Sequence, residues 1–237
     1  STGSSLAYVC AAKGYRFKVV TSDAFAPEKL ATMAALGAEL TIVPSEGGKI
    51  TPDLTPRMIE TAREMAADPD VYWTDQLHNA DSLVGYRWVG VELLEQMEQP
   101  IDVFCCAVGT SGMATGVRNA LDDGGSAAKV IIFEPDSSPV ISTGQPGTNS
   151  VEGIGIGIVP PLLDLDRFDG IRAVSEAGAF EMARRLAAEE GLLAGGSTGL
   201  NVTGAIEIAR ELGPGRTVVT LACDTGLKYL AGDLYRR

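Results

Sequence analysis

The residues best suited to chemistry form a short run rich in glycine and hydroxyl groups, residues 109–112 (GTSG), directly after an apolar stretch at residues 103–108. A continuous apolar stretch of this kind indicates a strand buried on both faces, and the pattern of residues 113–124 predicts a helix. A strand, tight turn and helix would direct several backbone N–H groups and the positive helix end toward one point, which suits a phosphate. The same residue types are common in ordinary strand–helix connections, so the loop alone leaves a phosphate site and a simple turn both open.

This loop lacks the features of the common nucleotide sites. No Gly-Lys followed by Ser or Thr comes after it, as a Walker A sequence requires, and its glycines do not have Gly-x-Gly-x-x-Gly spacing. A nicotinamide-dependent dehydrogenase is therefore not indicated. Any phosphate held here is expected to belong to a group other than a nucleotide.

The composition favours a protein with a sizeable core and without a nucleic-acid or membrane partner. The 237 residues suffice for one large or two small domains, and 45% of them are hydrophobic. The net charge of −12 opposes binding to nucleic acid or anionic membranes. No apolar stretch reaches membrane length and no secretory signal pattern is visible, so we expect a cytoplasmic protein.

Cysteine and histidine usage argues against a metal centre. The cysteines lie in apolar patterns without Cys-x-x-Cys spacing, and we interpret all of them as buried thiols: Cys10, Cys105, Cys106 and Cys223. His78 is the single histidine, which opposes a His-rich metal site and a Ser-His-Asp triad. We predict no metal ligands.

The elements that must position the loop alternate between strand and helix along the chain. Strands are expected at residues 15–21, 38–43, 71–74, 103–108, 129–134 and 217–223. Helices are expected at residues 6–14, 27–36, 52–67, 82–97, 113–124, 178–190, 197–212 and 226–235. This alternation predicts an α/β fold of parallel sheets covered by helices, with ligands at the carboxyl ends of strands. Residues 137–159 are too rich in Gly, Ser and Pro for a simple connection and are expected to be functional.

Several segments of the chain follow one another in a characteristic order. They are residues 6–21, 27–43 (PEKLATMAALGAELTIV), 109–116 (GTSGMATG), 134–140 (EPDSSPV), 153–160 (GIGIGIVP), 191–199 (GLLAGGSTG) and 223–230 (CDTGLKYL). One such match would be weak, but together they cover nearly the whole chain, and in this order they resemble the cysteine synthase family of pyridoxal-phosphate enzymes.

The resemblance implies the fold and its division into domains. Members of this family have fold type II, which consists of two three-layer αβα domains with parallel sheets. Residues 1–78 would be the remainder of the smaller domain, and residues 79–237 the larger domain that binds the phosphate of the cofactor. The region near His78 and Asn79 is a reasonable junction between the two.

The resemblance also implies the site. The cofactor would be pyridoxal 5′-phosphate, held by Gly109, Thr110, Ser111, Gly112, Met113, Ser197 and Ser1. A neutral hydroxyl at the ring nitrogen, here that of Ser197, does not keep this nitrogen protonated, which favours loss of a β-substituent over free carbanion chemistry. The amino-acid substrate would be bound by Thr2, Gly3, Gln76 and Gly153. As simpler alternatives, Ser197 is a helix N-cap, Gln76 a solvated amide and Asp224 a turn or cap residue.

The departures from the family pattern leave the substrate open. Ser1 stands where the family has an asparagine, Ser111 replaces a glycine, Met113 replaces a threonine, and Ala222 with Cys223 stands where many relatives have a proline. These differences indicate a side branch of the family.

The family's Schiff-base lysine, which is also its general base, precedes the segment that begins at Ser1. The lysines of this sequence lie in other contexts and are interpreted as surface residues: Lys13, Lys29, Lys49, Lys129 and Lys228. We therefore expect this sequence to be a piece of a longer polypeptide, with no catalytic lysine of its own.

The resulting function is β-replacement or β-elimination on a small amino acid, such as O-acetylserine with sulfide to give cysteine in amino-acid biosynthesis. A cysteine desulfhydrase and a serine/threonine dehydratase are alternatives within the same chemistry. A fragment that binds the cofactor phosphate without catalysis is an alternative of another class. The resemblance further implies a homodimer.

Overall fold

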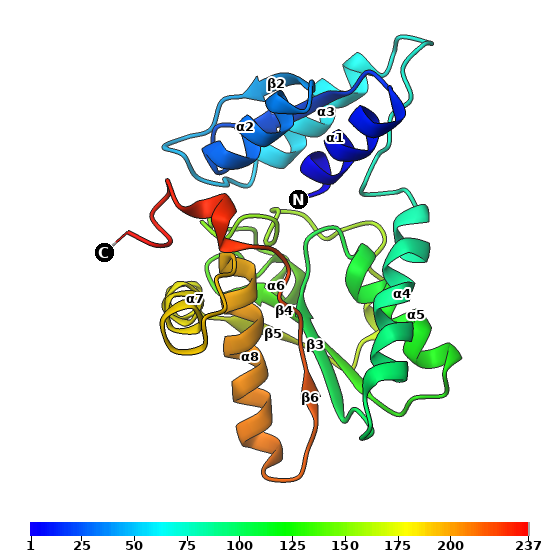
Figure 1. Cartoon of the computed structure of the whole chain (residues 1–237), viewed down its shortest axis with the longest axis vertical. Helices are drawn as coiled ribbons and strands as arrows, with labels where there is room; N and C mark the ends of the chain where they lie inside the picture. The colour runs from blue at the N-terminus through cyan, green and yellow to red at the C-terminus, as the bar shows by residue number, and fades with distance from the viewer. Residues whose placement is uncertain (237) are drawn as a thin grey trace.

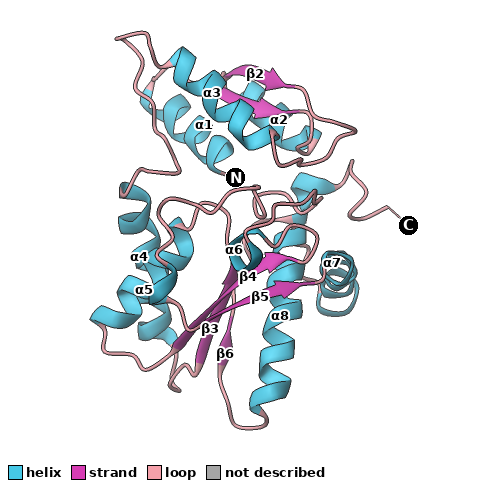
Figure 2. Ribbon diagram, turned by 180° about the vertical axis from the view of Figure 1, so that it is seen from behind, coloured by secondary structure: helices cyan, strands magenta, loops and turns pink. Residues whose placement is uncertain are grey.

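The computed structural model describes residues 1–236, which form two bodies, each with its own sheet (Figures 1 and 2). In the smaller body, two strands pair in parallel, with Lys18 opposite Glu39 and Ser22 opposite Val43. The elements of this body are α1 (Thr2–Lys13), β1 (Lys18–Ser22), α2 (Pro27–Ala35), β2 (Glu39–Val43) and α3 (Leu54–Met65). The left-handed conformation of Gly14 ends α1, as the sequence predicts.

The larger body is built on a parallel four-stranded sheet in the order β5-β4-β3-β6. Helices α4 and α5 cover one face and α7 and α8 the other (Figure 1). Its strands are β3 (Val103–Ala107), β4 (Lys129–Pro135), β5 (Gly170–Val174) and β6 (Val218–Val219). Its helices are α4 (Asp81–Gln96), α5 (Gly112–Asp123), α6 (Val140–Thr143), η1 (Leu165–Arg167), α7 (Glu176–Glu190), α8 (Gly196–Leu212) and η2 (Gly226–Tyr229).

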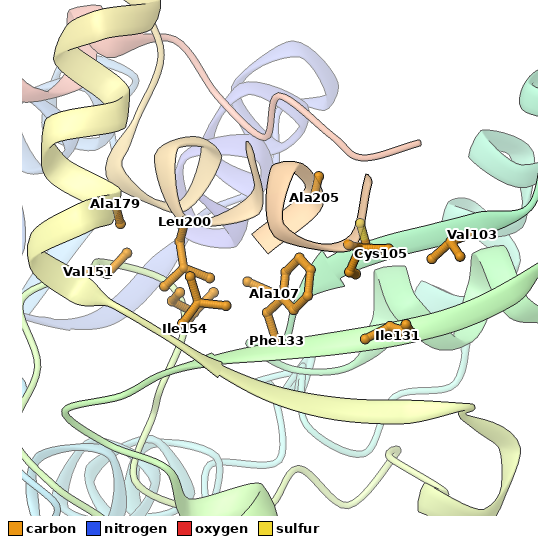
Figure 3. Packing of buried hydrophobic residues seen from close by; sticks show 12 residues of the cluster. Val103, Cys105, Ala107, Ile131, Phe133, Val151, Ile154, Ala179, Leu200 and Ala205 are labelled. Atoms are coloured by element: carbon orange, nitrogen blue, oxygen red, sulfur yellow. The ribbon is translucent and has the colours of Figure 1, made fainter. Parts of the chain in front are cut away.

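Alternate residues of β3 enter two apolar clusters on opposite faces of the sheet. Cys105 and Phe133 pack with Leu200 of α8 on one face (Figure 3). Phe104 and Cys106 pack with residues of α5 on the other face. The prediction of a strand buried on both faces is therefore confirmed, and this strand carries the 109–112 loop at its carboxyl end.

Three predicted elements differ from the structure, and one observed strand was not predicted. Residues 71–74 form no strand because they lie in the connection between the bodies, where only turn hydrogen bonds are made. The strand expected at 217–223 pairs only over Val218–Val219, since side chains replace its later ladder bonds. The helix expected at 226–235 is a single 3-10 turn, and strand β5 was not predicted.

The interpretation of every cysteine as buried is wrong for two of them. All four thiols are free, and Cys105 and Cys106 are buried in the clusters around β3. Cys10 is only half-buried, and Cys223 is exposed as a residue although its thiol is largely surrounded by protein atoms.

Within residues 1–236, no helix combines the length and the apolar character needed to span a membrane. The cytoplasmic location and the domain boundary at residue 78 stay predictions. The connection that contains this boundary joins α3 to α4.

Candidate active site

The 109–112 loop joins the end of β3 to the first turn of α5, and it presents backbone groups more than side chains. Ser111 has a left-handed φ of 72°. Its buried hydroxyl lies 2.8 Å from the hydroxyl of Thr115, so it points into α5. The backbone N–H groups of residues 109–113 make no hydrogen bond to any acceptor within the described chain. Unpaired N–H groups at a helix N-terminus form a ready anion site.

Glycine is required in this loop because two backbone segments approach closely. A Cβ atom added to Gly109 would lie 2.2 Å from the carbonyl oxygen of Gly153, and one added to Gly112 would lie 2.9 Å from Ser82 Oγ. Gly153 itself has a φ of 90°, which favours glycine. The structure thus brings two predicted site loops, around Gly109 and Gly153, into direct contact.

Ser197 lies in the first turn of α8, beside the carboxyl end of β3. It is buried, with 8% of its surface exposed. The N-cap of α8 is Gly195, and this cap has no side-chain hydrogen bond. The alternative interpretation of Ser197 as the N-cap is therefore wrong, and its hydroxyl lies close to the thiol of Cys223.

Asn201, one turn after Ser197, is a supporting residue that the sequence analysis missed. Its side chain is fully buried, with Oδ1 accepting from Ala107 N at 2.7 Å and Nδ2 donating to Leu221 O at 3.0 Å. The amide thereby ties the end of β3 to the segment after β6. A polar residue beside Leu200 in an otherwise apolar face of the helix was the available signal.

The thiols around this end of the sheet are neutral near pH 7. Burial raises the pKa of Cys105 to about 12 and also raises the pKa of Cys106. Burial raises the pKa of Cys223 as well, although hydrogen bonds to Ser197 and Asn201 act in the opposite direction. The surroundings of Ser197 therefore include uncharged hydroxyl, thiol and amide groups.

The remaining predicted residues, Ser1 for the cofactor and Thr2, Gly3 and Gln76 for the substrate, are only partly brought together. Ser1 Oγ donates to Asp224 Oδ2 at 3.3 Å, which joins the first segment to the last. Thr2 is exposed at the start of α1, and the Cα of Gly3 packs against Met33, to which an added Cβ would approach within 2.9 Å. Gln76 is exposed in the connection between the bodies, as its simpler interpretation predicts.

The placement of one further residue limits its expected role, and the placement of another contradicts the expectation. Met113 is half-buried and packs against the apolar cluster on the α5 side of the sheet, so only its backbone faces the loop. Lys29 is not a surface residue: its side chain is 8% exposed and pairs with Glu152. Spacing along the sequence could not show this because Glu152 belongs to a distant loop.

These features define a class of protein: a two-body α/β protein with an anion cradle at the carboxyl edge of its larger parallel sheet. The family model described as "Pyridoxal-phosphate dependent enzyme" matches residues 1–224, and the chain belongs to this family.

Relatives and solved structures agree with this assignment. A cysteine synthase of Staphylococcus aureus is 38% identical over 238 residues, which cover 99% of this chain and 74% of the relative. A probable cysteine synthase of Bacillus subtilis is 35% identical, covering 99% and 75%. The structure of O-ureido-L-serine synthase with bound O-ureido-L-serine superposes with a TM-score of 0.89 at 31% identity, covering 99% and 72%.

A hydrogen sulfide-producing enzyme of Fusobacterium nucleatum is similar too, with a TM-score of 0.89 at 30% identity, covering 100% of this chain and 71% of that chain. The fold is fold type II, as the sequence predicts, and the family's cofactor is pyridoxal 5′-phosphate. The residues present fit this group, because the unpaired N–H groups at the start of α5 match a phosphate and the neutral hydroxyl of Ser197 matches a ring nitrogen.

Proposed function

We propose that the protein catalyses pyridoxal-phosphate-dependent β-replacement on a small amino acid, with O-acetylserine and sulfide giving cysteine. The observation that carries this proposal is the cradle of unpaired N–H groups at residues 109–113, together with the buried, uncharged hydroxyl of Ser197 at the same end of the sheet. Cysteine synthases among the relatives support the choice of substrate.

When bound, pyridoxal phosphate supplies an electron sink that allows a substituent on the β-carbon of an amino acid to leave. The backbone N–H groups of Gly109, Thr110, Ser111, Gly112 and Met113 bind its phosphate and orient it. Close contact between Gly109 and Gly153 holds the cradle to the substrate-side loop.

Ser197 is assigned to the ring nitrogen of the cofactor. A hydroxyl there would donate a hydrogen bond to the ring nitrogen and leave the nitrogen unprotonated. A carboxylate at the same place would keep the nitrogen protonated. An unprotonated ring nitrogen makes the cofactor a weaker electron sink. This favours loss of a substituent from the β-carbon, as in the proposed reaction, over reactions of a free carbanion. Asn201 supports the assignment because it fixes the strand end beside Ser197.

The substrate carboxylate is assigned to the segment that begins α1, with Thr2 and Gly3, where a helix N-terminus favours an anion. Ser1 is assigned to the cofactor's 3-hydroxyl group, and Gln76 and Gly153 complete the substrate residues. Gln76 contacts substrate only if the connection between the bodies moves inward, since it is exposed here.

A homodimer is part of the proposal. Val84 and Trp88 lie four residues apart on α4 and are 66% and 63% exposed. Apolar side chains at this spacing share one face of a helix, and a second copy of the chain would cover them.

Two reactions with the cofactor-loaded protein test the function. Cysteine formation from O-acetylserine and sulfide is compared with sulfide release from cysteine alone. Faster cysteine formation supports the synthase. Faster sulfide release favours the desulfhydrase, which the likeness to a hydrogen sulfide-producing enzyme supports. Tight cofactor binding with neither reaction, nor serine or threonine deamination, overturns the proposal in favour of a non-catalytic binder.

A Ser197→Asp variant tests the assignment to the ring nitrogen. A carboxylate there raises the pKa of the nitrogen, so the absorbance of bound cofactor is expected to shift and the rate of β-replacement to fall. Ser197→Thr keeps a hydroxyl and serves as the control. An unchanged cofactor spectrum in Ser197→Asp would contradict the assignment.

A further inference from the structure

Lys29, in the first turn of α2, is a buried ammonium group with fixed partners. Its Nζ lies 2.8 Å from Glu152 Oε2 and donates to the hydroxyl of Tyr229 at 2.7 Å. It also lies 4.3 Å from the centroid of the Tyr229 ring. Removing a charge from water is costly unless its partners are held in place, so these three side chains form one unit. We call Lys29, Glu152, Tyr229 and Asp224 the Lys29 clasp.

The members of the Lys29 clasp come from parts of the chain that are far apart in sequence. Lys29 belongs to the smaller body, Glu152 to the loop before Gly153, and Tyr229 to η2. In Figure 1 the first turns of α2 lie near the C-terminal segment that contains η2. The clasp therefore joins the smaller body to the larger one.

Two backbone contacts strengthen the same junction. Ala26 N, just before α2, donates to Glu152 Oε1 at 2.9 Å. Ala231 N, just after η2, donates to Glu28 Oε1 at 2.6 Å. Glu152 thus holds both the start of α2 and its lysine, and the first turn of the helix is fixed from two sides.

The Lys29 clasp continues into the segments assigned to substrate and cofactor. The Tyr229 hydroxyl donates to Asp224 Oδ2 at 2.9 Å, and the same oxygen accepts from Ser1 Oγ at 3.3 Å. The backbone oxygen of Asp224 accepts from Gly195 N at 3.1 Å, two residues before Ser197. On the other side, Glu152 immediately precedes Gly153, whose carbonyl packs against Gly109.

We propose that Lys29 is a positioning residue that sets the smaller body, and with it the 1–3 segment, over the cofactor loops of the larger body. Lys29 does this through the clasp and touches neither substrate nor cofactor. This inference rests on the proposed function for its kinetic consequence. The phosphate cradle and Ser197 lie in the larger body, and Ser1 is the one cofactor residue assigned to the smaller body. Cofactor binding therefore depends on Lys29 much less than binding of the amino acid across the two bodies does.

A Lys29→Met variant of the cofactor-loaded chain tests the proposal, because it keeps the aliphatic stem and removes the ammonium. We expect KM for O-acetylserine to rise about tenfold, with kcat and the cofactor dissociation constant changed less than about threefold. Lys29→Arg is expected to recover most of the KM. Lys13→Met makes the same chemical change at an exposed position of α1 and is expected to behave as wild type.

Amide hydrogen exchange tests whether the clasp holds the two bodies together, and it does not require catalytic turnover. In Lys29→Met, the amides of Ala26 and Ala231 are expected to exchange about tenfold faster, while those of β3 keep their protection. If Lys29→Met does not fold, Glu152→Gln weakens the clasp while leaving an oxygen for Ala26 N, and a smaller change of the same kind is expected.

A loss of thermal stability and of cofactor affinity at unchanged KM would overturn the proposal and leave Lys29 as a support of folding only. Unchanged exchange at Ala26 and Ala231 would also overturn it. If the wild-type protein, with the family's Schiff-base lysine present, turns over none of the amino acids, the proposed function fails, and the exchange experiment still decides whether the clasp holds the two bodies together.

Discussion

The proposed phosphate cradle and the Lys29 clasp are built in opposite ways. The cradle consists of backbone from consecutive residues, 109–113, at the end of a strand whose side chains fill both large apolar clusters. The clasp consists of charged and polar side chains from three separate segments. A backbone site on a packed strand is held rigid by its scaffold. A junction of side chains between two bodies can open at the cost of a few hydrogen bonds, which suits a part that must admit substrate.

The two bodies show the same contrast in their cores. Both clusters around the four-stranded sheet consist of residues of the larger body. The smaller body has a two-stranded sheet, which is marginal without packing against other elements. Its position therefore depends on contacts made across the junction.

The largest effect is expected from Gly109→Ala, which breaks the cradle. The added Cβ would lie 2.2 Å from Gly153 O, and a backbone atom cannot move aside as a flexible side chain does. Overpacking of this kind costs about 3 kcal/mol, and we expect cofactor affinity to fall at least about tenfold. Chemical unfolding and a cofactor titration measure the two effects.

The control for this change is Gly85→Ala on α4. No atom lies within 4 Å of the Cβ that it adds. Alanine is a better helix former than glycine, so we expect a gain of about 0.5–1 kcal/mol. Equal effects of the two substitutions would contradict the account of Gly109.

A somewhat smaller effect is expected from Asn201→Ala, which removes the support of the cradle. Ala107 N and Leu221 O would lose their partners in a buried place, so the free energy of unfolding should fall by about 2 kcal/mol. Asn119→Ala, at a half-buried position of α5, is the comparison and should cost less. Cofactor affinity should fall with stability in Asn201→Ala. Wild-type stability in this variant would show that the amide is dispensable.

Tyr229→Phe tests the clasp rather than the cradle, because it removes the hydroxyl of Tyr229 and keeps the aromatic ring. Lys29 loses an acceptor and Asp224 a donor, and the expected loss of stability is about 1 kcal/mol. KM for the amino acid should rise less than in Lys29→Met, with cofactor affinity unchanged. Tyr72→Phe, at an exposed tyrosine of the connection, is the control. A fall in cofactor affinity in Tyr229→Phe would show that the two regions are not independent.

The smallest effect is expected from Asp102→Asn, and it depends on pH. The N–H of Thr217 and the guanidinium of Arg216 hold the pKa of Asp102 below its usual value. A carboxyl whose pKa is lowered on folding stabilises the protein above its unfolded pKa of about 4, and the gain disappears as pH falls through the folded value. Thermal unfolding should therefore separate wild type from variant at pH 7, and the difference should shrink as pH falls below about 4 and through the folded pKa of Asp102. A constant difference at all pH values would contradict this assignment.

Local sequence was sufficient to predict the cradle and most of the helices. The apolar run before residue 109 and the glycines after it specify strand, turn and helix within about twenty residues. Asn201, Lys29 and Glu134 could not be predicted in this way. Their partners lie in distant segments, as when buried Glu134 accepts from the N–H groups of Ile141 and Ser142 in another turn. A polar residue in an apolar pattern indicates burial with a partner, but not which partner.

The failures at 71–74 and 217–223 have one physical cause. Strand formation requires a neighbouring strand to supply hydrogen bonds, and apolar patterning does not reveal where the neighbour ends. After Val219 the segment beside β3 is held by side chains, with Thr220 Oγ1 donating to Cys105 O and Asn201 bridging to Leu221.

The shortness of β6 has a consequence for association between molecules. β6 is an edge of the larger sheet, and it offers only two residues of regular strand. Long, flat edge strands are templates on which another chain can add a strand and start aggregation, and short ones are poor templates. This edge is therefore protected against strand addition without a charged side chain or a proline at Val218 or Val219, so any strand added by another molecule is expected at the longer edge strand β5 rather than at β6.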